Sequence, residues 1–194
     1  MDSDTAQSVA LMQRCARGDE QALAALYDRW AGPLLHFIER MCRDRATAED
    51  LVQEVFLRVW RAAPRYEPTA KYSTWLFQVA RNAWLNEREK LLRRPAPMDI
   101  DGADSDGASV PAPAAPALSS CPEKAALDRE LAGRIDGAVQ RLPEKLREVW
   151  MLGAAQGLPY QEVAAILEIP VGTVKSRMFQ AVRLLRTDLE PYVA

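Results

Sequence analysis

Near the C-terminus, from Gly157 to Arg186, the chain reads GLPYQEVAAILEIPVGTVKSRMFQAVRLLR. Its hydrophobic pattern predicts two helices joined by a tight turn at 168–172. The first helix should cover 160–167, and Thr173 can cap the second. The second helix is expected to bury apolar side chains at helical spacing, namely Val174, Met178, Ala181, Val182 and Leu185. The stretch therefore has the form of a helix-turn-helix.

The opposite face of the second helix is basic and polar, and it carries Lys175, Ser176, Phe179, Gln180, Arg183 and Arg186. Basic and amide side chains on the second helix of such a pair are what a helix needs to read base edges in the major groove. Any short helical hairpin gives a similar apolar pattern, and a basic stripe is often only a solvated face. The stretch by itself indicates a DNA-binding helix-turn-helix, with a plain helical hairpin as the alternative.

The composition of the chain favours helix over strand. The 194 residues include only 9 glycines, and alanine, leucine, arginine and glutamate are abundant. The formal net charge of −2 gives no support for nucleic-acid binding by the chain as a whole. Residues 71–94 and 175–186 are nevertheless net basic, whereas 99–106 is acidic. We predict an all-α protein that contacts DNA in places and protein elsewhere.

Several classes of site are not expected. Cys15, Cys42 and Cys121 are far apart and His36 is the single histidine, so no metal site or disulfide framework is predicted. Acidic pairs such as Glu49 and Asp50 form no recognisable acid–base constellation, so we expect no enzyme activity and no cofactor. The N-terminus lacks the apolar core of a signal peptide, and no apolar run is long enough to span a bilayer. We expect a cytoplasmic protein without membrane insertion.

The N-terminal half is expected to form a series of helices. They should cover 5–16, then about 19–30 with Asp19 as the N-cap, and then 34–41 after a break or kink at 31–33. A further helix at 45–61, capped by Thr47, should bury one apolar face. Its other face holds Asp50, Gln53, Glu54, Leu57 and Arg61. One apolar residue ringed by charged and amide groups fits a protein-binding face, although single exposed leucines are common.

A loop at 64–72 precedes a long helix that Ser73 should cap and that should end near Leu92. Its polar stripe carries Gln78, Asn82 and Asn86 with Arg81 and Arg88 beside it. Aromatic residues interleaved with basic and amide groups suit contact with single-stranded DNA. Burial in the core is the alternative for the aromatic residues, and it is our expectation for Trp75 and Trp84.

Residues 95–122 are rich in proline, alanine, serine and aspartate, and they predict a disordered, flexible tether. The tether divides the chain into helical domains at 1–94 and 123–194. In the second domain a helix at 123–141 should bury Ala126, Leu131, Ile135 and Val139. A helix at 144–155 should follow it and lead into the helix pair described first.

The chain resembles bacterial RNA polymerase sigma factors of the extracytoplasmic-function (ECF) subfamily. DLVQEVFLRVW at 50–60 is similar to the helix of region two that binds core polymerase, and YSTWLFQVARN at 72–82 resembles the promoter-melting segment. The segments at 142–149, 157–164 and 170–177 are similar to region four. The resemblance covers both domains in the family's order and implies a region-two helical bundle and a region-four helix-turn-helix joined by the tether.

The resemblance also implies a function and a set of contacts. The chain would bind core RNA polymerase, through the β′ clamp and the β subunit, and direct promoter-specific initiation under the control of an anti-sigma factor. The expected core contacts are Asp50, Gln53, Glu54, Leu57 and Arg61. The expected contacts with the minus-ten element are Lys71, Tyr72, Gln78, Arg81, Asn82, Asn86 and Arg88. The expected contacts with the minus-thirty-five element are Thr173, Lys175, Ser176, Arg177, Phe179, Gln180 and Arg183.

Two of these positions carry more specific expectations. In the family a non-template base is extruded from the stack, and Asn82 is the residue that we expect to read it, with Asn86 next. Gln180 stands where several relatives have arginine. Glutamine favours adenine whereas arginine favours guanine, so the promoter sequence of another family member cannot be assumed for this chain.

Two other classes of protein remain open on the sequence. A simple helix-turn-helix regulator with an unrelated N-terminal domain would bind duplex operator alone, whereas a sigma factor should need core polymerase. A helical protein-interaction adaptor with no DNA role would keep promoter activity after alanine replaces Arg177 and Gln180.

Overall fold

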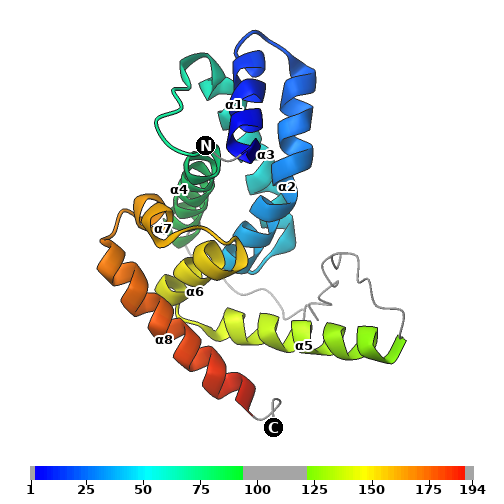
Figure 1. Ribbon diagram of the computed structural model, residues 1–194, viewed down its shortest axis with the longest axis vertical. Coiled ribbons are helices and arrows are strands. Elements are labelled where there is room, and N and C mark those ends of the chain that lie inside the picture. The colour runs from blue at the N-terminus through cyan, green and yellow to red at the C-terminus, as the bar shows by residue number, and fades with distance from the viewer. Residues whose placement is uncertain (1–2, 94–121, 191–194) are drawn as a thin grey trace.

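The computed structural model describes residues 3–93 and 122–190, and all regular structure within those ranges is helical, as predicted. The N-terminal bundle consists of α1 (Ser3–Cys15), α2 (Glu20–Cys42), α3 (Arg45–Ala62), the short 3-10 turn η1 (Ala63–Arg65) and α4 (Tyr72–Arg93). The C-terminal bundle consists of α5 (Pro122–Arg141), α6 (Glu144–Trp150), the π-helical turn η2 (Met151–Ala155), α7 (Tyr160–Leu167) and α8 (Val171–Leu189) (Figure 1).

Several predicted features lie at or beyond the ends of the described ranges. The predicted tether at 95–122 lies outside the described residues except for Pro122, which begins α5. The side chain of Ala126 and all of Cys121 also lie outside the described part. Among the described residues, no helix is long and apolar enough to cross a membrane.

Helix α2 is one continuous element, so of the break or kink predicted at 31–33 the break is wrong. Pro33 lies inside the helix, where it removes one backbone hydrogen bond. Packing on both sides of the proline outweighs that loss, because Leu26, Leu34 and Phe37 lie on the same buried face. The ring of Phe37 meets that of Phe77 on α4 edge-on, with centroids 5.6 Å apart. Contacts of this kind join α2 to the rest of the core.

The ends of the helices correct three predicted caps. Asp19 caps α2 as predicted, because its carboxylate accepts hydrogen bonds from the backbone amides of Gln21 and Ala22. Helix α3 is capped by Asp44 instead of Thr47, whose backbone amide donates to the Asp44 carboxylate at 2.8 Å. Helix α4 begins at Tyr72, before Ser73, and α8 begins at Val171, so Thr173 lies in its first turn. A cap must stand outside the helix that it serves, and neither Ser73 nor Thr173 does.

Tyr72 is a core residue, whereas the sequence predicted a loop at this position. Its side chain is fully buried, and its ring lies among those of Trp30, Tyr66 and Trp75, with centroids 5.7 to 6.2 Å away. These rings come from α2, the loop after η1 and α4, so local sequence gave no sign of the cluster. Trp84 is buried and Trp75 is half-buried, as expected.

The helix-turn-helix forms as predicted. Glu168 ends α7 in the left-handed conformation, with φ of 56°, and the amide of Ile169 donates to the carbonyl of Ala164 at 3.1 Å. Val174 and Leu185 are buried at the expected spacing, but Val182 is 46% exposed. Val182 lies at the edge of the apolar stripe, beyond the area that the neighbouring helices cover.

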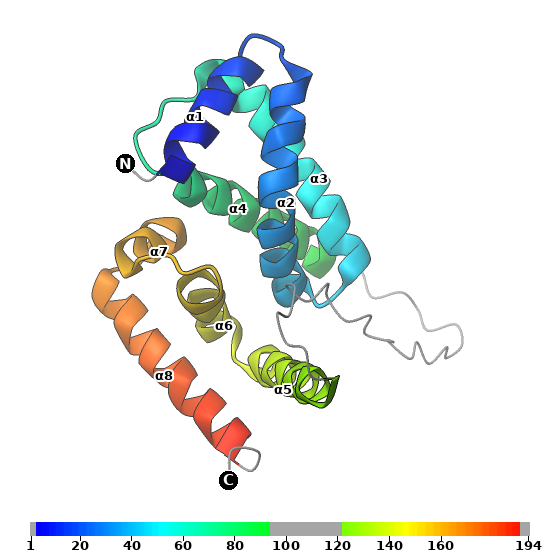
Figure 2. The same ribbon diagram turned by 45° about the vertical axis from the view of Figure 1, so that its right-hand side comes forward.

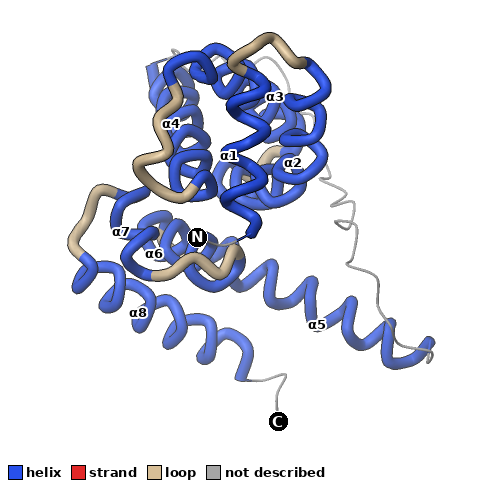
Figure 3. The backbone as a smooth tube through the Cα atoms, turned by 45° about the horizontal axis from the view of Figure 1, so that its top comes forward, coloured by secondary structure: helices blue, strands red, loops and turns tan. Residues whose placement is uncertain are grey.

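Helix α5 extends away from the rest of the C-terminal bundle toward its N-terminal end (Figure 3). Leu131 in this helix is 41% exposed, so its predicted burial is wrong, whereas Val139 near the other end is buried. The two bundles are in contact, with α7 against α4 and α6 against α2 (Figure 2). This contact places helices from both halves of the chain beside the polar stripe of α4.

Candidate nucleic-acid and protein interfaces

The outer face of α3 is open to solvent and has an apolar centre. Leu57 is 54% exposed. Around it Asp50, Gln53 and Arg61 are exposed, and Glu54 is half-buried. The opposite face of α3 is buried and keeps the helix in place, through Ala48, Leu51, Val52, Val55, Phe56 and Val59. Leu57 therefore stands on a rigid element with polar groups on its rim, as a protein-binding anchor requires.

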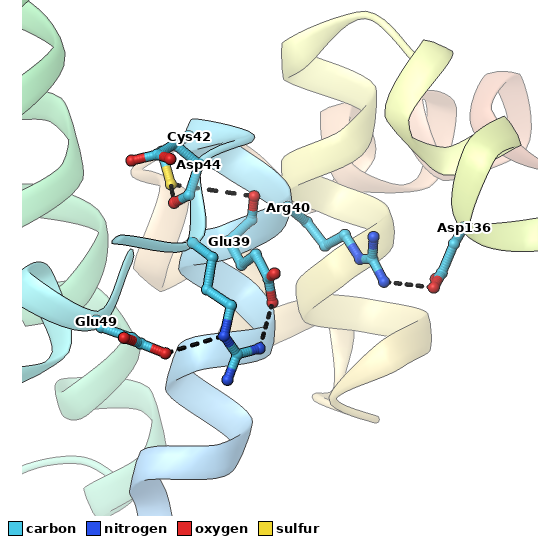
Figure 4. A network of polar contacts seen from close by, with 7 residues as sticks. Glu39, Arg40, Cys42, Asp44, Glu49 and Asp136 are labelled. Atoms are coloured by element: carbon cyan, nitrogen blue, oxygen red, sulfur yellow. Dashed lines mark hydrogen bonds and ion pairs between the residues drawn. The ribbon is translucent and has the colours of Figure 1, made fainter. Parts of the chain in front are cut away.

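A network of polar contacts holds the start of α3 against the end of α2 (Figure 4). The guanidinium of Arg45 lies 2.9 Å from the Glu49 carboxylate and 3.7 Å from that of Glu39. The Cys42 thiol donates to the carbonyl of Asp44 at 3.0 Å. Because these groups are exposed or half-buried, each contact is weak, but together they orient the end of α3 relative to α2.

The predicted minus-ten residues, which lie on α4 except for Lys71 just before it, fall into three groups. Asn82 and Asn86 are exposed. Lys71, Gln78, Arg81 and Arg88 are half-buried and lie on one stripe, with spacings of seven, three and seven residues. Lys71, Arg81 and Arg88 of this stripe contact the C-terminal bundle. Tyr72 is fully buried, so in this structure it lies out of reach of any ligand at the surface.

A pocket of about 630 Å³ opens where α3, η1 and the following loop meet α4. It is lined by Arg58, Arg61, Ala62, Arg65, Tyr66, Glu67, Thr69 and Trp75. Guanidinium groups and aromatic rings of this kind can hold a phosphate and stack on a base. Of these residues the sequence analysis assigned only Arg61 to a site. The alternation of arginine and aromatic residues over 58–75 was the available signal.

The predicted recognition face of α8 is open to solvent. Lys175, Ser176, Gln180 and Arg183 are exposed and Phe179 is 70% exposed, whereas Thr173 and Arg177 are half-buried. On the other side of the helix, Val174, Met178, Ala181 and Leu185 anchor α8 to the bundle. The hydroxyl of Ser176 donates to the carbonyl of Thr173 at 3.0 Å. The face has the shape and chemistry of a major-groove reading helix.

The basic stripe of α4 meets carboxylates of the C-terminal bundle. Arg81 pairs with Glu148 at 3.2 Å, Arg88 with Glu144 at 2.7 Å and Lys71 with Glu162 at 2.9 Å. The Thr74 hydroxyl also donates to Glu162, at 2.8 Å. Three of the cations assigned to DNA thus have anionic partners on α6 and α7. These carboxylates could not be predicted from the sequence, because the pattern of one helix does not show which side chains of another domain lie against that helix.

Glu148 is the most buried of the three carboxylates. Burial raises the pKa of Glu148 above its ordinary value, while the charges of Arg81 and Arg177 and the hydrogen bond from Arg81 oppose that rise. Arg177 belongs to α8, so this one carboxylate is electrostatically coupled to both predicted DNA-binding helices. The net direction means that the loss of hydration of Glu148, together with the negative charge of Glu144, outweighs the favourable effect of Arg81 and Arg177.

In the wild-type chain, ionisation of buried Glu148 should lower the free energy of unfolding as pH rises. Replacing Glu148 with glutamine is expected to remove this loss. An acid whose pKa is raised in the folded state contributes its full stabilisation below its ordinary pKa, and loses it as pH rises through the raised value. The difference in unfolding free energy, variant minus wild type, should therefore increase with pH above the ordinary range of glutamate. Denaturant titrations over a pH series measure it. Exposed Glu168→Gln is the control, and a level or falling difference for Glu148→Gln would contradict the prediction.

Comparison with known proteins covers both bundles. The family model described as sigma-70 region 2 matches residues 26–94, and the model described as sigma-70 region 4 matches residues 132–185. The RNA polymerase sigma-H factor of Pseudomonas aeruginosa is 31% identical over 185 residues, which cover 95% of each chain. The ECF RNA polymerase sigma-E factor of Escherichia coli K12 is 31% identical over 183 residues, which cover 94% of each chain.

Two solved structures share the fold. CnrH, in complex with the cytosolic domain of CnrY, has a TM-score of 0.66 at 22% identity, over 96% of this chain and 99% of that one. The sigma factor RpoE, in complex with the anti-sigma factor NepR from Bartonella quintana, has a TM-score of 0.62 at 25% identity, over 88% and 96%. With two family regions in order and relatives that match from end to end, the chain belongs to the RNA polymerase sigma factors of the sigma-70 family, in its ECF subfamily.

Proposed function

We propose that this chain binds core RNA polymerase and directs initiation at promoters that carry a minus-ten and a minus-thirty-five element. The observation that carries the proposal is the presence, on one chain of this family, of an exposed Leu57 face in region two and an exposed basic face on α8 in region four. Polymerisation of nucleotides is assigned to the polymerase, and this subunit supplies promoter choice and strand opening. Because its partner is core RNA polymerase, we assign the chain to the cytoplasm.

The proposed division of labour follows the two bundles. Residues 1–94 bind core polymerase and the minus-ten element, residues 123–194 bind the minus-thirty-five element, and residues 95–122 connect them. On α3, Leu57 is the apolar anchor against the β′ clamp, and the carboxylate of Asp50 on its rim favours a basic partner surface. The carboxylate of Glu54, also on the rim, pairs with Arg58 in the free chain.

For the minus-ten element, α4 supplies exposed amides and the neighbouring pocket supplies cations and rings. Asn82 lies two helical turns from Trp75, so the two residues face similar directions on α4. If a base is bound at Asn82, the adjacent nucleotides of the same DNA strand would lie close to the arginines and aromatic rings of the pocket. Stacking and phosphate contacts of this type offset the few kcal/mol that unstacking a base costs.

For the minus-thirty-five element, α8 supplies Lys175, Arg177 and Gln180 near the start of the helix, where recognition helices contact bases and phosphates. The aromatic ring of Phe179, which is 70% exposed, can contact the methyl group of a thymine. We assign regulation to an anti-sigma factor, because RpoE of Bartonella quintana was solved in complex with one and shares this fold.

Transcription in vitro with core polymerase and a library of genomic promoter fragments tests the proposal. A defined set of promoters should give transcripts that depend on this chain. A gel shift separates the alternatives, because a simple regulator would bind its duplex site without polymerase. The region-two match over 26–94 argues against that alternative, and it equally argues against an adaptor with no DNA role.

Replacing Gln180 with alanine is expected to lower initiation at minus-thirty-five-dependent promoters by about fivefold, since one base contact contributes about 1 kcal/mol or more. The loss should be specific to one base pair, so changing that pair in the promoter should have little further effect on the variant. Exposed Gln161 on α7 gives the matched control as Gln161→Ala. Equal initiation by wild type and Gln180→Ala across all promoters would show that Gln180 reads no base.

A further inference from the structure

Tyr72 is the one residue assigned to the minus-ten element that lies wholly inside the N-terminal bundle. Its side chain is 0% exposed, and it is not among the residues that line the pocket beside Trp75. The ring of Tyr72 nevertheless contacts two residues that do line the pocket, Tyr66 and Trp75. An influence of Tyr72 on bound DNA would therefore act through these two neighbours.

The rings of Tyr66, Tyr72 and Trp75 form a closed group in which each ring contacts the other two. The centroids lie 4.9 Å apart for Tyr66 and Trp75, 5.7 Å for Tyr72 and Trp75, and 6.2 Å for Tyr66 and Tyr72. The ring planes meet at 47°, 62° and 72°, within the tilted and edge-on arrangements that aromatic pairs prefer. Two of the rings line the pocket and the third is in the core, so the buried ring supports the other two.

The loop on one side of the pocket depends on this group for its attachment. From residue 64 to residue 70, every side chain is exposed except that of Tyr66, which is half-buried. The backbone amide of Tyr66 also donates to the carbonyl of Ala63 in η1, at 3.2 Å. Exposed side chains contribute little packing. The position of the Tyr66 ring therefore determines where its pocket-lining neighbours Arg65 and Glu67 lie.

Tyr72 is held in turn by Trp30 on α2, which does not line the pocket. The ring centroids of Trp30 and Tyr72 lie 5.7 Å apart. The indole Nε1 of Trp30 donates to the hydroxyl of Ser8 on α1 at 3.2 Å, and Ser8 is fully buried. Because the indole has a single donor, this hydrogen bond fixes the orientation of the Trp30 ring. A series of contacts thus leads from α1 and α2 through Tyr72 to the pocket.

The ring of Tyr72, and not its hydroxyl, makes these contacts. The hydroxyl groups of Tyr66 and Tyr72 are buried, and neither has a hydrogen-bond partner among the described residues. A buried hydroxyl without a partner lowers stability, whereas a buried ring adds to stability by its area and by its contacts with other rings. Phenylalanine should therefore serve at position 72 as well as tyrosine does.

We propose that Tyr72 is a positioning residue for the minus-ten element. Its buried ring holds Tyr66 and Trp75 in the orientation in which unpaired bases stack on them, and Tyr72 itself makes no contact with DNA. This inference rests on the proposed function, because it takes the pocket as the place where nucleotides beside the base at Asn82 bind. Rings that are already held in place lose little conformational entropy when a base stacks on them. Without the Tyr72 ring, Trp75 could turn, and the stacking would weaken.

The test measures open-complex formation with core polymerase on a duplex promoter that the chain directs. Tyr72→Leu keeps an apolar side chain but removes the ring, and it should lower open-complex formation about tenfold, the effect of losing one stacked base. Tyr72→Phe should stay within about twofold of wild type, because it loses only the unpaired hydroxyl. Both variants should bind core polymerase with wild-type affinity, since the outer face of α3 is unchanged.

A double-mutant cycle shows whether Tyr72 acts through Trp75. Trp75→Ala alone should also lower open-complex formation about tenfold, and adding Tyr72→Leu should lower it by less than about twofold more. If Tyr72 contacted DNA directly, the two losses would multiply. The matched control is Phe37→Leu, because Phe37 is another fully buried ring and contacts Phe77. It should form open complexes within about twofold of wild type.

Four results would each overturn the positioning role: losses that multiply, wild-type opening by Tyr72→Leu, a loss in Tyr72→Phe as large as in Tyr72→Leu, or an equal loss in Phe37→Leu. Circular dichroism shows whether Tyr72→Leu folds. If it does not fold, Trp30→Leu takes its place in the cycle, because Trp30 contacts Tyr72 from outside the pocket, and its loss should also disappear in the Trp75→Ala background. Failure of the wild-type chain to direct any promoter with core polymerase would instead overturn the proposed function.

Discussion

Replacing Leu57 with alanine is expected to weaken binding to core RNA polymerase by about 30-fold, the effect of losing roughly 2 kcal/mol at an interface hot spot. Leu57 is the one large apolar side chain on the outer face of α3, and it is 54% exposed in the free chain. A partner that covers it would remove apolar surface from water at the centre of a polar rim. Alanine removes most of that surface and keeps the helix, because alanine is the best helix former.

The control for Leu57 comes from the other end of the chain. Leu184 on α8 is 40% exposed and takes no part in any assigned contact, so Leu184→Ala should bind core polymerase as wild type does. Both variants should unfold at the wild-type denaturant concentration, since neither leucine fills the core. Titration of labelled chain with core polymerase gives the affinities. Wild-type affinity for Leu57→Ala would show that the outer face of α3 is not the core-binding surface.

Replacing Asn82 with alanine is expected to reduce open-complex formation on duplex promoters by about 30-fold, since a bidentate amide–base pair contributes about 1–3 kcal/mol. Asn82 is exposed, while its neighbours Ala83 and Trp84 are buried and hold α4 in place. The substitution therefore removes an amide from the surface without disturbing the core. The contact with an extruded base offsets the cost of taking that base out of the stack.

A pre-melted promoter separates this role from general DNA binding. In a template with a mismatched bubble the bases are already unpaired, so the Asn82→Ala defect should be much smaller than on duplex. The exposed amide of Gln13 on α1 provides the control, and Gln13→Ala should open both templates as wild type does. Potassium permanganate footprinting of unpaired thymines measures opening. An equal defect on both templates would mean that Asn82 binds DNA without assisting strand opening.

Two predictions from the sequence were wrong because packing between helices overrode local sequence preferences. The break at 31–33 follows from how proline acts on its own helix, but Leu26, Leu34 and Phe37 keep one buried face through Pro33. Tyr72 followed a polar loop in the sequence, yet the rings that bury it come from residues as distant as Trp30. In both cases the deciding contacts join separate elements, which no periodicity within one element can show.

The candidate sites also differ in whether one helix or several separate elements form them. The faces of α3 and α8 could be derived from the sequence, because a helix with one buried stripe must expose the residues opposite to it. Leu57 and Phe179 are exposed for that reason. The pocket beside Trp75 could not be derived, because it is assembled from α3, η1, the loop and α4. The arginines and aromatic residues over 58–75 indicate which kinds of side chain are available there, but not that they line one pocket.

The helical class, the helix-turn-helix and the outward faces of α3 and α8 could therefore be predicted from the amino-acid sequence, since each follows from spacing within one helix. The contacts of Lys71, Arg81 and Arg88 with carboxylates of α6 and α7 are visible only in the folded chain. Thr74 and Glu162 are 88 residues apart in the chain, and Arg81 and Glu148 are 67 apart. Which charges meet over such separations depends on how the two bundles pack, and the energy of that packing is shared among many residues of both.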